Sequence, residues 1–93
     1  MSADRYLGFV YQLEITKPAT RALRRMPVNA ARLIRGRLDQ VVEDPMLAPD
    51  VKPLKGRPGF RLRVGDWRVI YELDHARRRL VVLDIGPRGS VYG

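Results

Sequence analysis

The stretch from Phe60 to Leu73 constrains the fold more than any other, because apolar and charged side chains alternate along it on both sides of a short turn. Alternation with a period of two is typical of strands that have one buried and one exposed face. Gly65-Asp66 separates the two arms as a two-residue turn, so the arms are expected to pair. The predicted C-terminal strands are residues 60–64, 67–73 and 80–85, with a second turn at 74–79.

The N-terminal half is predicted to contain one strand and two helices. Residues 11–15 alternate and indicate the strand. Thr16 offers an N-cap oxygen, and Pro18 suits the first turn of a helix. Met26-Pro27 interrupts the helical pattern, because the residue before a proline is disfavoured in the helical region. An antiparallel helical hairpin is therefore expected, with helices at about 17–25 and 28–43 and a buried stripe of Ala31, Ile34, Leu38, Val41 and Val42.

Residues 45–59 hold four prolines and two glycines, which predicts a long loop. The element order is then β-α-α-β-β-β. This order predicts an α+β fold, in which an N-terminal helical hairpin packs on one face of an antiparallel sheet. A chain of 93 residues is expected to form a single domain over 1–93, with 1–8 as a loosely ordered N-terminal segment.

The residue inventory excludes several kinds of chemistry. The chain has no cysteine and a single histidine, His75, which argues against thiol nucleophiles, histidine triads and Cys- or His-built metal sites. We therefore expect neither a metal nor a cofactor. No apolar run approaches the ~18 residues that span a membrane. No basic flank followed by an apolar stretch opens the chain, so we expect no signal peptide and a cytoplasmic protein.

Positive charge is concentrated in the second half of the chain. The formal net charge is +8, of which +2 falls in residues 1–50 and +6 in residues 51–93. Fifteen of the 18 basic residues are arginines, whose planar guanidinium suits phosphate. A small domain with one basic half is typical of proteins that bind polyanions.

Part of this excess is expected to form a patterned arginine surface. If the helices cover the apolar face of the sheet, Arg61 and Arg63 stand on the open face, about 6.5–7 Å apart. Arg68 follows the turn on the neighbouring strand and is expected beside Arg63. No acidic residue stands between these three in the pattern. Arg88 and Tyr92 follow the last strand and are expected to return to the same edge.

Such a cluster suits RNA chemistry as well as RNA binding. RNA carries its own nucleophile, the 2′-hydroxyl, so its cleavage needs a group to take that proton, a group to protonate the leaving oxygen, and positive charge around the phosphorus. Arginines supply the charge, but they are poor proton shuttles because their pKa lies above ~12. Tyr92, with an ordinary pKa near ~10, is the best candidate for proton transfer.

Three segments of this sequence resemble the RelE family of toxins, in the RelE/ParE superfamily. They are Leu54-Lys55-Gly56, the run from Phe60 to Tyr71 (FRLRVGDWRVIY), and the run from Val82 to Tyr92 (VLDIGPRGSVY). The resemblance covers about residues 9–92. It implies a RelE-like fold and a ribosome-dependent mRNA endonuclease, which cuts A-site codons through the RNA 2′-hydroxyl and leaves a 2′,3′-cyclic phosphate.

The resemblance also implies roles for five residues. Arg61 and Arg63 match two basic positions, lysines in the best-known members, that are implicated in proton transfer and phosphate binding. Arg68 matches an arginine that stabilises the transition state, and Arg88 a second arginine that acts as general acid or charge stabiliser. Tyr92 matches a tyrosine that stacks on the base or helps to activate the 2′-hydroxyl. Arginine at 61 and 63 leaves the identity of the general base open.

The implied partners are a cognate antitoxin and the ribosome with its mRNA, with operator DNA bound only through the antitoxin complex. Further RNA contacts are expected from basic residues on the loop and at the 74–79 turn, while His75 is expected to be a solvated turn residue. Two alternatives stay open: a ParE-like, non-enzymatic inhibitor of DNA gyrase, and a simple RNA-binding module. The additional RNA-binding candidates are Lys52, Lys55, Arg57, Arg77, Arg78 and Arg79.

Overall fold

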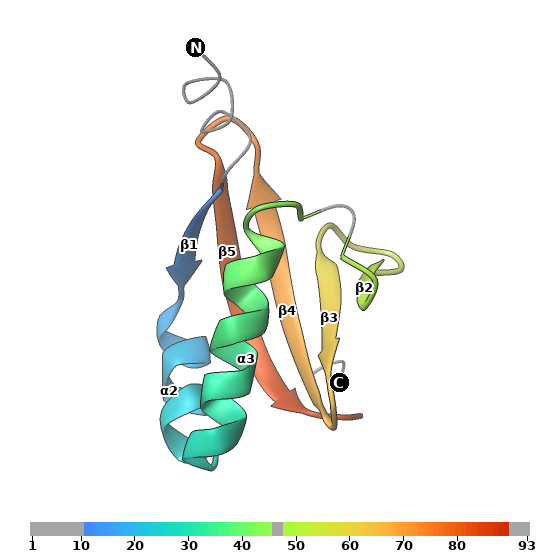
Figure 1. The fold of residues 1–93 in the computed structure, drawn as a ribbon. Coiled ribbons are helices and arrows are strands. Elements are labelled where there is room, and N and C mark those ends of the chain that lie inside the picture. Colours follow the sequence, from blue (N-terminus) through green and yellow to red (C-terminus); the bar gives the residue numbers. More distant parts are fainter. Residues whose placement is uncertain (1–10, 46–47, 90–93) are drawn as a thin grey trace.

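The computed structural model describes residues 11–45 and 48–89, which form two helices and a five-stranded sheet (Figure 1). The sheet order is β1-β5-β4-β3-β2. β1 runs parallel to β5, and the other neighbours are antiparallel. The predicted α+β architecture is confirmed. Its elements are β1 (Gln12–Ile15), α2 (Lys17–Arg25), α3 (Val28–Val41), β2 (Val51–Pro53), β3 (Phe60–Val64), β4 (Trp67–Asp74) and β5 (Arg79–Pro87).

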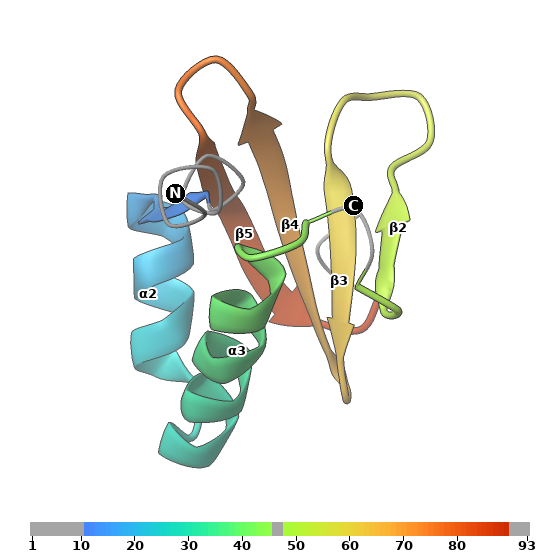
Figure 2. The same cartoon turned by 45° about the horizontal axis from the view of Figure 1, so that its top comes forward.

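The two helices form the expected antiparallel hairpin with its corner at Met26-Pro27 (Figures 1 and 2). Pro18 lies in the first turn of α2, and Met26 ends that helix in an extended conformation with φ −91° and ψ 164°. The prediction that Thr16 caps α2 with its side chain is wrong. Its Oγ1 instead donates to the carbonyl oxygens of Val82 (2.8 Å) and Leu83 (3.2 Å), so it ties the helix start to β5.

The core lies between the helices and one face of the sheet. α3 contributes Ile34, Leu38 and Val41, all almost fully buried. The helix ends at Val41, two residues before the predicted end. The sheet side of the core includes the alternate apolar positions of β3 and β4, as predicted. The sheet contributes Leu62, Val64, Val69, Tyr71, Leu80, Val82 and Ile85.

Residues 45–59 contain a strand that the sequence did not reveal. β2 pairs antiparallel with β3 at the edge of the sheet, with Val51 opposite Leu62 and Lys52 opposite Arg61. Pro53 ends this strand, a position tolerated only because β2 is an edge strand. A short connection returns the chain to β3. It passes through Gly59 (φ 114°), where a Cβ atom would lie 2.9 Å from the backbone oxygen of Tyr71.

The β3–β4 hairpin matches its prediction closely, because Val64 pairs with Trp67 across the Gly65-Asp66 turn. Gly65 has a φ of 57°, the left-handed conformation that a tight hairpin turn requires at its first position. β5 runs beyond the predicted 80–85, and its pairing with β4 shifts register between Ile70 and Tyr71. Neither helix in the described part of the chain is long and apolar enough to cross a membrane.

Candidate functional site

The sheet face turned away from the helices carries basic side chains in direct register. We call it the open face and define it by Lys52, Arg61, Arg63, Arg68 and Ile70. Arg63 pairs with Arg68, which confirms the predicted adjacency, and Lys52 pairs with Arg61. Residues directly opposite in an antiparallel ladder have Cα atoms about 4.5–5.5 Å apart. Like charges at such positions repel, so this face is arranged for a counter-anion rather than for stability.

Arg68 is the centre of this arrangement. It lies on the open face beside Arg63, as expected, but the residue is only 9% exposed. Its Nη1 donates to the backbone oxygens of Gly65 and Trp67, both at 2.9 Å. Burial lowers the pKa of this guanidinium, and the positive charges of Arg88, Arg61 and Arg63 lower it further, while Asp66 opposes them. Three neighbouring guanidinium groups therefore act on Arg68, and we call Arg61, Arg63, Arg68 and Arg88 the arginine cluster.

Arg88 reaches the cluster from the end of β5. Its backbone N–H donates to the backbone oxygen of Asp66 at 2.8 Å, which ties the chain after β5 to the β3–β4 turn. Arg88 itself is exposed. Gly86, two residues earlier, is the register partner of Arg68. The structure thus brings together all four arginines singled out in the sequence.

Ile70 is an apolar residue that lies among the charged side chains of the open face. Ile70 is only 2% exposed, yet it does not belong to the core between the helices and the sheet. It pairs with Arg61 on one side and with Asp84 on the other. A buried apolar position beside the cationic groups lowers the local dielectric and strengthens their attraction for an anion.

A carboxylate does lie beside the cluster, which corrects the expectation that no acidic residue interrupts it. Oδ1 of Asp50 accepts from Nη2 of Arg63 at 3.4 Å, and its Oδ2 accepts from Nη2 of Arg37 at 3.1 Å. The backbone N–H of Arg63 also donates to the backbone oxygen of Asp50 at 3.0 Å. Asp50 and Arg37 are thus site residues that the sequence did not reveal.

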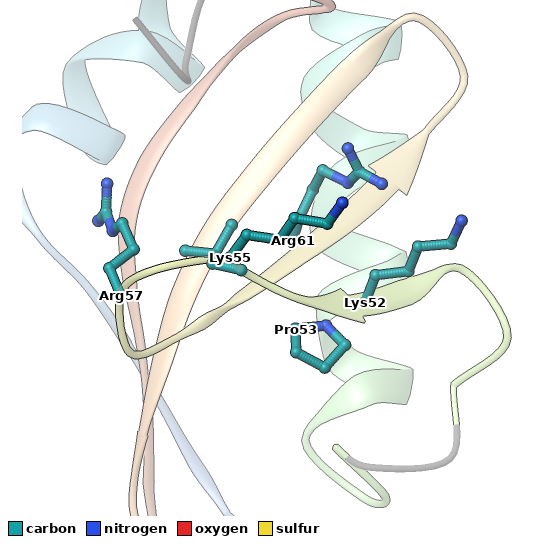
Figure 3. Close-up of a pocket in the computed structure, with 6 residues that line it drawn as sticks. Lys52, Pro53, Lys55, Arg57 and Arg61 are labelled. Carbon is teal, nitrogen blue, oxygen red and sulfur yellow. The ribbon is translucent and has the colours of Figure 1, made fainter.

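The basic loop residues gather around the same face. Lys52, Lys55, Arg57 and Arg61 line a hollow of about 520 Å³ together with Pro53 and Leu54. Figure 3 shows Lys52 and Arg61 extending from the same side of their strands. A second, smaller hollow joins Asp50, Lys52, Arg61 and Arg63. The hollows make one continuous basic surface with the arginine cluster.

The three arginines of the predicted 74–79 turn lie at the other end of β4 from Arg68 and the β3–β4 turn (Figure 1). They are Arg77, Arg78 and Arg79. Nε of Arg77 lies 4.0 Å from Oδ2 of Asp74, and Nη1 of Arg79 lies 3.1 Å from Oε1 of Glu14. Arg78 adopts a left-handed conformation with φ 56°. They therefore form a separate patch, and their contact with RNA stays a prediction.

The structure describes Tyr71 and Tyr11 but not Tyr92. Tyr92 lies outside the described residues, so its predicted role is not tested. Tyr71 is fully buried, and its hydroxyl donates to the backbone oxygen of Pro45 at 3.2 Å. Burial raises the pKa of that phenol, so Tyr71 is structural. His75, expected to be a solvated turn residue, lies 2.6 Å by its Nδ1 from the hydroxyl of Tyr11.

The described side chains offer charge stabilisation rather than a metal site. Among residues 11–45 and 48–89, no group of three or more His, Asp or Glu side chains could hold a metal ion. The arginine cluster brings several guanidinium groups near Arg68, an arrangement that can bind phosphate and stabilise added negative charge on it.

Comparisons with known proteins agree with this geometry. Residues 13–92 match the family described as the ParE toxin of the type II toxin–antitoxin system parDE. No curated protein sequence matches the chain. Among solved structures, the RelE–RelB complex from Pyrococcus horikoshii superposes with a TM-score of 0.76 at 29% sequence identity. That match covers 88% of this chain and 99% of the other.

Two further structures are similar in fold at lower identity. The intact RelBE toxin–antitoxin complex of E. coli matches with a TM-score of 0.74 and 18% identity, over 84% of this chain and 96% of the other. A YoeB/ParE toxin from Agrobacterium tumefaciens matches with a TM-score of 0.72 and 18% identity, over 83% of this chain and 98% of the other.

Proposed function

We propose that this chain, which belongs to the RelE/ParE superfamily of type II toxin–antitoxin toxins, cleaves mRNA on the ribosome as a metal-independent endoribonuclease. The observation that supports this most is the arginine cluster on the open face. Its other three members repel a largely buried Arg68. Such an arrangement costs folding free energy unless an anion is bound, so it points to function.

The proposed reaction uses the 2′-hydroxyl of the RNA. A base removes its proton, the 2′-oxygen attacks the adjacent phosphorus, and the bond from phosphorus to the 5′-oxygen breaks. The leaving 5′-oxygen takes up a proton from a general acid, and the products are a 2′,3′-cyclic phosphate and a 5′-hydroxyl. The pentavalent intermediate carries extra negative charge, which Arg68 and Arg88 would stabilise with preformed donors.

Arg61 and Arg63 would hold the flanking phosphates from neighbouring positions on the same strand face. Their spacing of about 7 Å is close to that of successive phosphates in an extended strand. Lys52, Lys55 and Arg57 line the adjoining hollow with Arg61 and would continue the backbone contact. Tyr92 would handle the proton of the 2′-hydroxyl, because a phenol, with an ordinary pKa near ~10, gives up its own proton more readily than a guanidinium does.

The partner that would control this activity is a cognate antitoxin. The solved structures from Pyrococcus horikoshii and E. coli are complexes of a toxin with its antitoxin. We propose that this chain forms a comparable complex, and that it meets operator DNA only through that partner.

Primer extension on mRNA after induction of the chain tests the proposal, with and without ribosomes. The wild type is expected to cut translated mRNA and to leave free RNA intact. Arg68→Ala is expected to lose the cuts, while Arg35→Ala, which removes an exposed arginine of α3, is expected to keep them. Cuts that persist in Arg68→Ala would remove Arg68 from the reaction.

A second candidate function is inhibition of DNA gyrase without cleavage. It is favoured by the match to the family described as ParE toxin over residues 13–92. A supercoiling assay with purified gyrase separates the two candidates. Inhibition of supercoiling by a chain that makes no mRNA cuts would establish the second and overturn the first.

A further inference from the structure

Asp50 forms a direct ion pair with Arg63, a member of the arginine cluster. Its carboxylate is shared between Arg63, on the open face, and Arg37, on α3. The side chains of Asp50 and Arg37 are 35% and 24% exposed, whereas that of Arg63 is 64% exposed. The better-buried pair therefore anchors the more exposed cluster arginine.

The same contact has a backbone component. Asp50 immediately precedes β2, and the N–H of Arg63 donates to its carbonyl oxygen at 3.0 Å. The residue is therefore fixed to β3 by its backbone and to α3 by its side chain. The ion pair with Asp50 restricts the rotamers of Arg63, whose side chain is otherwise largely exposed to solvent.

Charge gives Asp50 a second effect. One carboxylate beside the cluster offsets part of the repulsion among its guanidinium groups and weakens the attraction of the surface for phosphate. A residue that only stabilised RNA binding would not be acidic. The carboxylate at this position thus lowers the affinity for RNA, and its benefit would be the fixed orientation of Arg63.

We infer that Asp50 is a positioning residue: through its bond to Arg37 it holds Arg63 in a fixed orientation and moderates the charge of the cluster. RNA is bound less tightly as a result, but it is bound in register for cleavage. This inference rests on the proposed function for its catalytic part and on the surface charge alone for its binding part.

Asp50→Asn tests both effects together, because asparagine keeps the size, removes the charge and weakens the contacts with Arg37 and Arg63. RNA binding is expected to tighten about threefold at low salt, in line with one weak surface ion pair lost. The maximal cleavage rate on ribosomes is expected to fall about tenfold, since a misplaced group lowers the rate steeply. Asp50→Glu is expected to restore part of that rate.

Asp39→Asn is the matched control, because it removes the same charge from an exposed position of α3 that pairs only weakly with Arg35, at 4.0 Å. Arg37→Gln is the second test variant, since it frees Asp50 from its anchor. It is expected to lower the maximal rate about threefold without tightening binding.

Binding to a single-stranded RNA oligonucleotide and cleavage on ribosomes are measured in parallel, with thermal unfolding. Tighter binding together with slower cleavage in Asp50→Asn supports the inference. Equal behaviour of Asp50→Asn and Asp39→Asn overturns it, and so does a joint loss of binding, cleavage and stability.

A wild type that cuts no mRNA refutes the proposed function instead. The binding comparison between the two asparagine variants then decides the charge effect alone. Equal affinities would overturn that effect too.

Discussion

Arg63 and Arg68 are register partners across the β3–β4 hairpin, with their guanidinium groups on the same face of the sheet. Two like charges at directly opposite positions destabilise a hairpin by roughly 0.2–1 kcal/mol. A second such pair, Lys52 with Arg61, lies next to the first. The open face therefore holds unfavourable charge pairs that a bound phosphate chain would relieve.

This repulsion can be measured at Lys52, which is exposed and lies opposite Arg61. Lys52→Gln is expected to raise the melting temperature by about 2–4 °C at low salt, because it removes one like-charge contact. The gain should shrink at high salt, where exposed charges are screened. Thermal unfolding at two salt concentrations checks this, and a lower melting temperature at low salt would contradict it.

Arg88 is expected to matter for cleavage and little for stability. Its side chain is exposed, and its contact with the β3–β4 turn is made by its backbone N–H. Arg88→Ala should lower the cleavage rate about 100-fold, as loss of a charge-stabilising donor does. The free energy of unfolding should change by less than about 0.5 kcal/mol. Arg32→Ala, an exposed change on α3, is the control; an Arg88→Ala variant as active as that control would exclude Arg88 from the site.

Tyr71 is expected to matter for stability and little for cleavage, because its phenol is buried and hydrogen-bonded to the backbone of Pro45. Tyr71→Phe should lower stability by about 1 kcal/mol at neutral pH through loss of that hydrogen bond, with cleavage intact. Burial raises the pKa of this phenol in the folded chain, so its contribution is fully present below the unfolded pKa of about 10 and is lost as the pH rises above it. The difference in the free energy of unfolding between the wild type and Tyr71→Phe should therefore become smaller above pH ~10. Chemical unfolding across alkaline pH measures this, and a constant difference would count against it.

RNA binding by the open face should depend steeply on salt. If four arginines each neutralise one phosphate of a single strand, the logarithm of the RNA-binding constant falls against the logarithm of the salt concentration with a slope of roughly −3. Arg63→Gln should reduce the steepness of that slope by about 0.7. A salt titration with an RNA oligonucleotide gives both values, and a flat dependence would remove phosphate contact as the basis of binding.

Much of the site was predictable from sequence, because two-residue turns fix the register of a hairpin. Alternation placed Arg61 and Arg63 on one strand face, and the Gly65-Asp66 turn put Arg68 opposite Arg63. The burial of Arg68 was not predictable in this way. β4 is the middle strand of the sheet, and a period of two says which face a residue occupies but not what surrounds it.

Asp50 escaped prediction because its contacts depend on β2. That strand has three residues, ends in Pro53 and lies within a proline-rich segment, so local pattern favours a loop. The prediction for the Thr16 side chain was wrong for a related reason. Its side chain was expected to cap α2 locally, but carbonyl oxygens of β5 lie close enough to accept its hydrogen bonds. In each case a partner distant in the sequence decided the outcome.

Replacement of one 2′-hydroxyl tests the central claim most directly. The same mRNA is presented to the chain on ribosomes with either ribose or 2′-deoxyribose at the nucleotide on the 5′ side of the cleaved phosphate. The account predicts cleavage of the all-ribose mRNA, with a 2′,3′-cyclic phosphate end, and none at the deoxy position. Equal cleavage of both mRNAs would contradict it, since the nucleophile would then come from elsewhere than the RNA.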